Sequence, residues 1–221
     1  MTGIGPSGAV FSPDGARVLT FAIDMTARLW DAGTGAELAC LADHRDRIDD
    51  AAFSPDGAHA VTASWDAEAI VWSVTPGAEA FGTVVARLQG HEGKVSSAEF
   101  SADGRRILAS GDDCTARLWD AATGAEIVCL RGHESWARAA TFSPDGPRIA
   151  TASFDKTARI WDAAASGAYA TFVAADGAAT AVAFSPNGAR IVTGAQSGAL
   201  GVFDVADGSP TFGAAVGRLD G

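Results

Sequence analysis

The stretch FSPDGPRIATASFDKTARIWD, residues 142–162, decides the fold of this chain. It opens with a turn signal, PDG at 144–146, because proline presets φ, aspartate tolerates turn geometry and glycine readily takes a positive φ. Two β-like runs follow, 148–153 and 157–161, with a tight polar turn around Asp155 between them. The stretch therefore predicts a turn followed by a β-hairpin.

The same pattern recurs along the whole chain. The phenylalanine that opens it repeats at intervals of 42, 47, 42 and 42 residues, at Phe11, Phe53, Phe100, Phe142 and Phe184. The aromatic residue that closes each hairpin repeats at the same intervals, at Trp30, Trp72, Trp119, Trp161 and Phe203. A fixed period in the low forties is the signature of a repeat architecture.

Each repeat contains four strand-like runs. In the first run the apolar residues are three and then two positions apart, as in Ile48, Ala51 and Phe53, which predicts one inserted residue, a β-bulge. The hairpin supplies two more runs, and a last one closes each unit, at 37–41, 84–88, 126–130, 168–172 and 214–219. We expect strands even in the alanine-rich stretch 163–183, although alanine favours helices, because it lies in register with the strand-forming copies.

Composition limits the classes of partner. The chain has 221 residues, of which 48% are hydrophobic, so it can bury a sizeable core. Its net charge of −11 argues against general binding to nucleic acid or anionic lipid, since both need clustered lysine and arginine. No apolar run approaches the roughly 18 residues of a membrane span, so we expect no membrane insertion.

The cysteines and the N-terminus indicate the compartment. Three cysteines are an odd number, so we expect buried small hydrophobes rather than a disulfide framework. The N-terminal segment lacks the basic and apolar regions of a signal peptide. Together these features predict a protein of the reducing cytoplasm.

Several motifs of the chain resemble those of the WD-repeat family. Trp30-Asp31, Trp119-Asp120 and Trp161-Asp162 match its Trp-Asp dipeptide, and Gly90-His91 and Gly132-His133 match its Gly-His pair. The resemblance covers nearly all of the chain. It implies an all-β fold, a β-propeller of four-stranded antiparallel blades. We expect one domain, 1–221, with blades at 4–42, 43–89, 90–131, 132–173 and 174–221.

The family usually has seven blades, and five are visible here. The sequence resembles a piece of a longer repeat array. Three arrangements stay open at this point: an open arc, a closed five-blade ring, and completion by another chain or segment. Open blade edges would favour self-association.

One set of residues resembles a catalytic triad. Histidine, threonine, aspartate and tryptophan recur at matching positions, and the repetition favours a buried hydrogen-bond network, which the resemblance also implies. Its members are His44, Thr62, Asp66, Trp72, His91, Asp113, Trp119, His133, Thr151, Asp155 and Trp161. Blade 1 lacks the histidine, blade 3 has Ala109 in the hydroxyl position, and blade 5 has Ala175, Ser197 and Phe203 in place of histidine, aspartate and tryptophan.

Other motifs are weak. The segment 3–8 matches GxGxxG, but no strand precedes it and no helix follows it, as a dinucleotide site requires. The histidines and cysteines show no metal-ligand spacing. We therefore expect no cofactor, no metal and no catalytic residue.

The stronger candidates for a functional site are residues that flank each bulge or directly precede the turn aspartate. In the resembled family these places form the partner-binding rim. Tryptophan and arginine are also enriched in interface hot spots. The residues are Arg47, Asp49, Trp65, Lys94, Asp112, Trp136, Arg138 and Phe154, with Ser96, Ile23, Thr180 and Gln196 as lesser members. Packing on neighbouring loops is the alternative role for these side chains.

The sequence thus predicts a non-catalytic scaffold that binds a protein or peptide on this rim. A partner side chain would enter between Trp136, Phe154 and Trp65, and the charged rim residues would pair with partner charges. The uniform alanine-rich copies resemble bacterial multidomain signalling proteins, in which such repeats act as sensor or docking modules. Two alternatives are a small-molecule or catalytic site in a central channel and a structural fragment without its own partner.

Overall fold

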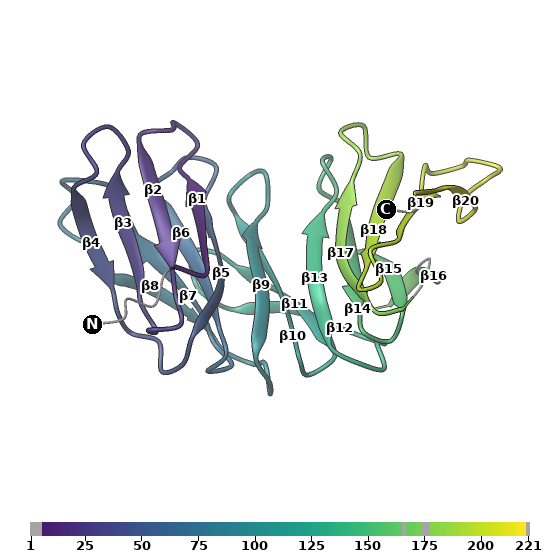
Figure 1. Cartoon of the computed structure of the whole chain (residues 1–221), viewed down its shortest axis with the longest axis horizontal. Coiled ribbons are helices and arrows are strands. Elements are labelled where there is room, and N and C mark those ends of the chain that lie inside the picture. Colours follow the sequence, from purple (N-terminus) through teal and green to yellow (C-terminus); the bar gives the residue numbers. More distant parts are fainter. Residues whose placement is uncertain (1–5, 165–166, 174–176, 220–221) are drawn as a thin grey trace. The chain divides into compact units, whose positions relative to one another are not determined.

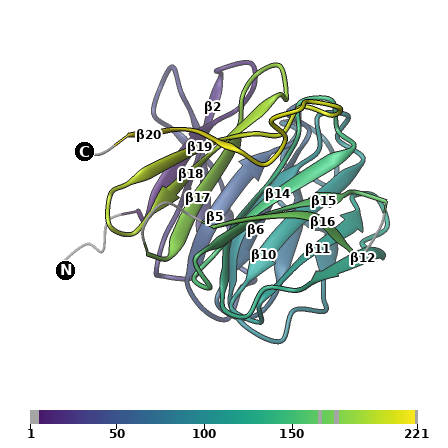
Figure 2. The same ribbon diagram turned by 90° about the vertical axis from the view of Figure 1, so that its right-hand side faces the viewer.

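The computed structural model describes residues 6–164, 167–173 and 177–219, and every regular element among them is a β-strand. The chain divides into two compact units, Met1–Ala109 with Trp119–Ile127 and Ser110–Leu118 with Val128–Gly221. Figure 1 shows the strands of both units, and Figure 2 shows β14 to β20 from another side. The prediction of an all-β fold without helix in the alanine-rich stretch is confirmed for the described residues.

The described residues form twenty strands in five four-stranded sheets, each hydrogen-bonded in chain order. The first sheet holds β1 (Gly8–Phe11), β2 (Arg17–Phe21), β3 (Ala27–Asp31) and β4 (Glu37–Leu41). The second holds β5 (Ile48–Phe53), β6 (His59–Ser64), β7 (Ala69–Ser73) and β8 (Val84–Leu88). The third holds β9 (Val95–Phe100), β10 (Arg106–Gly111), β11 (Thr115–Asp120) and β12 (Glu126–Arg131).

The fourth sheet holds β13 (Ala137–Phe142), β14 (Arg148–Ser153), β15 (Thr157–Asp162) and β16 (Ala168–Val173). The fifth holds β17 (Ala179–Phe184), β18 (Arg190–Ala195), β19 (Leu200–Asp204) and β20 (Ala215–Leu219). Consecutive strands joined by short turns pair antiparallel. These sheets are the five predicted blades, numbered 1 to 5 in chain order.

The bulge predicted near the start of each blade is confirmed in three of them. The pairing of the first two strands shifts between Ile48 and Asp50, between Ala137 and Ala139, and between Ala179 and Ala181. Asp49, Arg138 and Thr180 are therefore the inserted residues. A bulge redirects a side chain that strict alternation would place on the other face of the sheet.

The turn motif, SPDG in blades 1, 2 and 4, SADG in blade 3 and SPNG in blade 5, has the same geometry in every blade. Its glycine takes a φ of 68–88°, which a side chain would strain. In blade 1 the Ser12 hydroxyl donates to Asp14, and the backbone N–H of Arg17 donates back to that hydroxyl at 2.9 Å. The turn thus places the first residue of β2 in a fixed position.

That residue is a buried arginine which ties one blade to the next. The Arg17 guanidinium donates to the carbonyl oxygens of Val74 (2.5 Å) and Gly57 (2.9 Å) in blade 2. Arg148 repeats both bonds from blade 4 to blade 5, with Val205 at 2.5 Å and Gly188 at 2.9 Å. We call this contact the arginine clamp. Sequence reasoning missed it, although an arginine repeats at this position as Arg17, Arg106, Arg148 and Arg190.

Each unit has its own apolar core. Leu19, Leu29, Ile48 and Trp72 are buried together in the first unit. In the second unit Ile160, Phe172, Ile191 and Phe203 form the corresponding cluster. These residues come from the faces of adjacent sheets, so each blade is stabilised by its neighbour rather than alone.

One expectation about the cysteines is wrong. Cys40 is exposed, because β4 is the outermost strand of its blade and no further strand covers it. Cys114 and Cys129 are half-buried, and all three are free thiols. Within the described residues no helix has the length and apolar character needed to cross a membrane.

The arginine clamp generates a stability prediction. Replacing Arg148 by Met removes the donors of two carbonyl oxygens, so the free energy of unfolding should fall by about 2–4 kcal/mol. The control is Arg131→Met, because Arg131 is exposed on the outer strand β12, and it should change stability by less than about 0.5 kcal/mol. Urea unfolding measures both, and equal effects of the two variants would contradict the clamp.

Candidate functional site

The triad-like residues of blade 2 lie in one hydrogen-bonded chain. His44 precedes β5, Thr62 is on β6, Asp66 lies in the following turn and Trp72 is on β7. The Nδ1 atom of His44 is 2.9 Å from Asp66 Oδ2, and its Nε2 atom is 2.7 Å from Thr62 Oγ1. The Trp72 indole N–H donates to the same hydroxyl at 2.9 Å.

Blade 4 repeats this chain with the same atoms. His133 lies 2.7 Å from both Asp155 Oδ2 and Thr151 Oγ1, and the Trp161 indole donates to Thr151 at 2.8 Å. The other carboxylate oxygen of Asp155 accepts from the Thr157 hydroxyl at 2.6 Å. The equality of the two blades shows that the arrangement belongs to the repeat and not to one unique site.

The proton positions follow from the indole. Because the indole N–H can only donate, the threonine hydroxyl accepts from it and can donate its own proton to imidazole Nε2. We therefore assign the imidazole proton to Nδ1, where it is donated to the aspartate. Both Thr62 and Thr151 are fully buried, so neither hydroxyl is placed to attack a substrate.

The same contacts shift the pKa values of these groups. Burial opposes the charge on Asp66, but the hydrogen bonds from His44 and from the Arg45 N–H outweigh it and lower its pKa to about 2. In Asp155 burial is likewise outweighed, by hydrogen bonds from Thr157 and His133, and its pKa is also lowered to about 2. Burial lowers the pKa of His133 below 6.5, against the opposing effect of Asp155.

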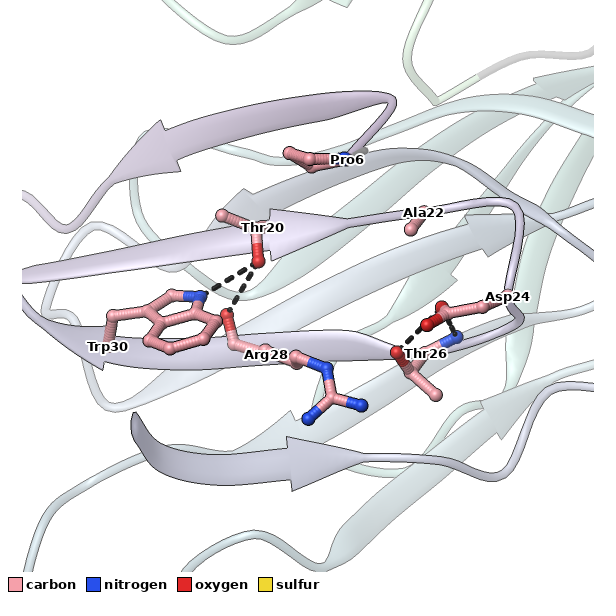
Figure 3. A pocket seen from close by; sticks show the side chains of 7 residues that line it. All are labelled: Pro6, Thr20, Ala22, Asp24, Thr26, Arg28 and Trp30. Atoms are coloured by element: carbon pink, nitrogen blue, oxygen red, sulfur yellow. Dashed lines mark hydrogen bonds between the residues drawn. The ribbon is translucent and has the colours of Figure 1, made fainter. Parts of the chain in front are cut away.

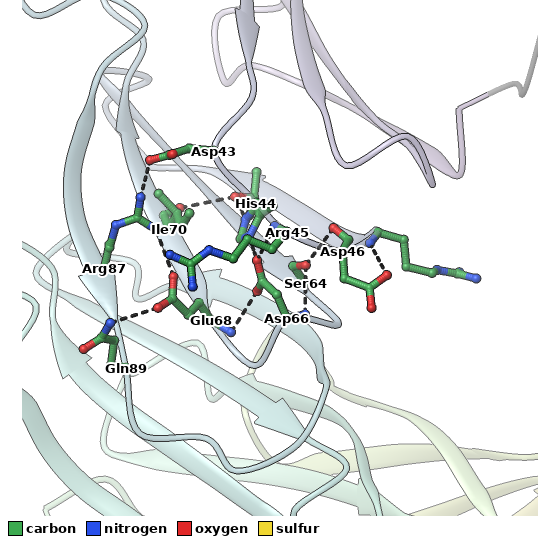
Figure 4. Close-up of polar contacts among 12 residues, drawn as sticks. Asp43, His44, Arg45, Asp46, Ser64, Asp66, Glu68, Ile70, Arg87 and Gln89 are labelled. Atoms are coloured by element: carbon green, nitrogen blue, oxygen red, sulfur yellow. Dashed lines mark hydrogen bonds and ion pairs between the residues drawn. The ribbon is translucent and has the colours of Figure 1, made fainter.

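In blade 2 the network continues to the surface (Figure 4). The backbone N–H of Glu68 donates to Asp66 at 3.0 Å. The Glu68 carboxylate in turn accepts from Arg87 at 2.9 Å and from Gln89 at 2.8 Å, and Arg87 also pairs with Asp43. The outermost strand, β8, is thereby linked to the turn between β6 and β7.

Blade 3 departs from this pattern where the sequence does. Ala109 replaces the threonine, and the Trp119 indole instead donates to the Gln89 carbonyl oxygen over a long 3.4 Å. The rings of His91 and Trp119 remain 5.6 Å apart. Asp113 is half-buried and binds the N–H of Thr115 at 3.1 Å.

Blades 1 and 5 hold only part of the network. The Trp30 indole donates to Thr20 at 2.8 Å, but blade 1 has no histidine. Thr193 Oγ1 of blade 5 is buried without a hydrogen-bond partner within the described ranges. Ala175, expected at the histidine position, lies outside the described residues, as does the start of the glycine-rich segment 3–8.

The structure positions rim residues in pairs. The residue before the turn aspartate, or before Ser197 in blade 5, donates its backbone N–H to the carbonyl oxygen of the residue that precedes the first strand. This bond joins Trp65 to Arg47 at 3.0 Å, Phe154 to Trp136 at 2.9 Å and Gln196 to Ala178 at 2.8 Å. Two side chains at each of these places are therefore held side by side by the backbone.

In the first unit this pairing forms a basic-aromatic cluster of Trp65, Arg47, Lys94 and Asp49. The Arg47 guanidinium carbon lies 4.3 Å from the centre of the Trp65 ring, and the Lys94 ammonium nitrogen lies 3.3 Å from it. Arg47 also pairs with Asp49 at 2.5 Å. Trp65 is thus covered partly by its own unit, with each cation–π contact contributing on the order of 1 kcal/mol.

In the second unit the pairing forms an aromatic pair. The rings of Trp136 and Phe154 are 5.4 Å apart and tilted by 35°. Trp136 is 48% exposed, whereas Phe154 is half-buried beneath this contact. An exposed, ordered tryptophan of this kind presents a large apolar area at little cost in conformational entropy.

The remaining candidates have varied surroundings. Arg138 and Asp112, both in the second unit, are half-buried and make other interactions. Ser96 is buried, while Ile23 and Gln196 are exposed and Thr180 is half-buried. Among the described residues no group of histidine, cysteine, aspartate and glutamate is arranged to hold a metal ion.

Comparison with known families agrees with the repeat pattern. The sequence model described as "WD domain, G-beta repeat" matches residues 5–31, 35–73, 82–120, 124–162 and 168–204. Each match ends one residue after the aromatic residue that closes a hairpin. The five matches together cover well over half of the chain. No curated protein matches it.

The pKa shifts predict how stability depends on pH. Because the pKa of His133 is lower in the folded state, the unfolded chain takes up a proton first, and stability should fall as pH drops below about 6.5. Asp66 and Asp155 stabilise the fold above their ordinary pKa of 3.8, and this contribution should be lost as pH falls from 3.8 toward 2.

Urea unfolding between pH 7.5 and pH 4.5 measures the contribution of His133 to the pH dependence of stability. The His133→Gln variant should show a weaker dependence there than the unmodified chain. His59→Gln is the control, because His59 lies outside the network, and it should keep the original dependence. An unchanged pH profile in His133→Gln would contradict the assignment.

Proposed function

Because the chain belongs to the WD domain, G-beta repeat family, we propose that it is a non-catalytic scaffold whose rim binds a protein or peptide segment. The family's repeats are protein-interaction scaffolds in general. The finer proposal is that the aromatic pair, Trp136 with Phe154, is the main anchor. The scaffold would serve as a docking or sensor module of a bacterial signalling protein.

The observation that carries the proposal is the exposure of Trp136. Trp136 is 48% exposed, and leaving this much apolar surface in contact with water is unfavourable. Here its ring lies against that of Phe154, with the ring centres 5.4 Å apart, and a backbone hydrogen bond of 2.9 Å from the Phe154 N–H to the Trp136 carbonyl oxygen holds the two residues side by side. A partner side chain that covers the remaining face would meet a surface that is already ordered, so little entropy would be lost on binding.

The charged rim residues would set selectivity. Lys94 and Arg47 in the first unit and Arg138 in the second offer positive charge to partner carboxylates, within a chain of net charge −11. Asp49 holds Arg47 in place, and Asp112 offers negative charge near the corresponding turn of blade 3. Charges at such positions affect association rate and choice of partner more than affinity.

Truncation of the anchor should weaken binding. With a purified partner obtained by affinity capture, Trp136→Ala should raise the dissociation constant at least about tenfold, since hot-spot tryptophans contribute more than 1.4 kcal/mol. The control is Ile127→Ala, because Ile127 is 50% exposed on the outer strand β12 and should change the constant less than about twofold. Titration calorimetry measures both, with unchanged unfolding midpoints as the check of folding.

If Trp136→Ala binds the partner as tightly as the unmodified chain does, the aromatic pair is not the anchor.

A second proposal concerns self-association through unmatched halves of the arginine clamp. In the clamps of Arg17 and Arg148 the guanidinium also lies 5.5 Å from a phenylalanine ring of the next blade, Arg17 over Phe53 and Arg148 over Phe184. Phe11 has the same repeat position but is 68% exposed. Arg190 has the arginine position and is exposed.

The backbone acceptors of a further clamp are also present in blade 1. The N–H of Ala32 donates to Ala16 at 2.9 Å, as Val74 does to Ala58 and Val205 to Ala189 at the same distance. Val74 and Val205 are the residues whose carbonyl oxygens accept from the clamp arginines. We infer that Arg190 of one copy binds the blade 1 face of a second copy, at Phe11 and Ala32.

Mixing of variants tests this contact. The unmodified chain should increase in mass with concentration in sedimentation, whereas Arg190→Ala and Phe11→Ala should each remain single chains. An equimolar mixture of the two variants should form two-chain species, because each supplies the half that the other lacks. A wild-type mass that stays that of one chain at all concentrations would refute the contact.

A further inference from the structure

Blade 1 contains a cavity that the rim proposal does not use. It has a volume of about 160 Å³ and lies between β2, β3 and the chain before β1 (Figure 3). Its lining comprises Pro6, Thr20, Ala22, Asp24, Thr26, Arg28 and Trp30. Thr20, Asp24 and Trp30 are the blade 1 counterparts of the threonine, aspartate and tryptophan that surround His44 and His133.

The aspartate of this cavity is oriented as it is in the complete network. Asp24 Oδ1 accepts from the Thr26 N–H at 3.0 Å and from the Thr26 hydroxyl at 2.7 Å. Asp155 Oδ1 accepts from Thr157 in the same way, at 2.8 and 2.6 Å. In blade 4 the second oxygen, Oδ2, then binds imidazole Nδ1. In blade 1 that oxygen accepts no hydrogen bond from the residues that the structure describes.

The threonine is oriented equally well. Thr20 Oγ1 accepts from the Trp30 indole at 2.8 Å, as Thr62 and Thr151 do from theirs. Its own proton points only to a distant acceptor, the Arg28 carbonyl oxygen at 3.4 Å. Trp30 is half-buried, whereas Trp72 and Trp161 are fully buried beside a histidine ring.

None of the four histidines of the printed sequence stands at the position that would fill this cavity. The three network histidines, His44, His91 and His133, each precede their turn aspartate by 22 residues. The residue 22 positions before Asp24 is Thr2. The fourth histidine, His59, begins β6 in blade 2 and is held in that sheet by its pairing with Ser73.

We propose that the blade 1 cavity binds an imidazole ring supplied by another molecule, either a small imidazole compound or a histidine side chain of a peptide. One ring N–H donates to Asp24 Oδ2, and the other nitrogen accepts from the Thr20 hydroxyl. The edge of the ring covers Trp30. This site is distinct from the aromatic pair and does not depend on the rim proposal.

The indole N–H of Trp30 reports on the cavity directly, because it donates to Thr20. In the ¹⁵N-labelled full chain its NMR signal, assigned with Trp30→Phe, should shift in a saturable way as imidazole is added. The titration is run near pH 8.5, about two units above the ordinary pKa of a histidine ring, so that the probe is neutral. Neutral 1-methylimidazole lacks the N–H for Asp24 and should need at least a tenfold higher concentration.

Variants separate the cavity from other sites. Thr20→Val should weaken imidazole binding at least tenfold, and so should Asp24→Ala. Asp14→Ala is the matched control, since Asp14 is an exposed aspartate of the same blade outside the cavity. It should bind imidazole as the unmodified chain does. The unfolding midpoint of each variant is measured first, and the shift is read from Trp30 in each.

A peptide arm distinguishes the two sources of imidazole. The tetrapeptide Arg-Gly-His-Glu copies residues 131–134, and Arg-Gly-Ala-Glu is its control. Saturation by the histidine peptide at a tenfold lower concentration than imidazole assigns the site to a histidine of another chain, and equal concentrations assign it to a small compound. The proposal is overturned if neither probe gives a saturable shift, or if 1-methylimidazole and both cavity variants behave as imidazole and the unmodified chain do.

Discussion

A buried threonine hydroxyl that accepts from an indole and donates to an imidazole is the interaction on which each complete blade depends. It joins the second strand to the third through tryptophan, and to the preceding loop through histidine. The aspartate that binds the other imidazole nitrogen also fixes the turn between those strands. The loop before the first strand, the second strand, the turn and the third strand of a blade are thus held by one chain of hydrogen bonds.

The geometry of this network favours a structural role for residue types that are otherwise typical of catalysis. The hydroxyl of Thr151 is fully buried, accepts from the Trp161 indole and donates to His133, so it has no access to a substrate. The low pKa of Asp155 and the lowered pKa of His133 keep an ionised carboxylate beside a neutral ring. Blade 1 has the same aspartate and threonine hydroxyl but lacks the histidine ring. The two groups that hold a ring in blades 2 and 4 are therefore the ones that we propose bind an external imidazole in blade 1.

The contacts between neighbouring blades have a different basis. The arginine clamp satisfies backbone carbonyl oxygens at the turn and strand ends of the next blade, where regular sheet pairing offers no donor. The rim side chains are placed by backbone bonds across the bulge, so their identity is free to vary from blade to blade. The repeated residues therefore stabilise the fold, and the rim positions can differ in residue type from blade to blade without disturbing it.

The sequence by itself determined the strand order, the turns, the bulges of blades 2, 4 and 5, and the residues of the hydrogen-bond network in blades 2 and 4. Each of these depends on local chemistry repeated at a fixed period: the φ of glycine, the alternation of side chains, and the matching of donors with acceptors. Only the tertiary structure decided which groups are buried, how the Arg17 guanidinium reaches the next blade, and that Cys40 is exposed on an outer strand. The tertiary structure also showed that Arg47 and Lys94 cover the Trp65 ring, whereas Trp136 is exposed to solvent. Sequence alone could not distinguish the two tryptophans, because their exposure depends on residues from other parts of the chain.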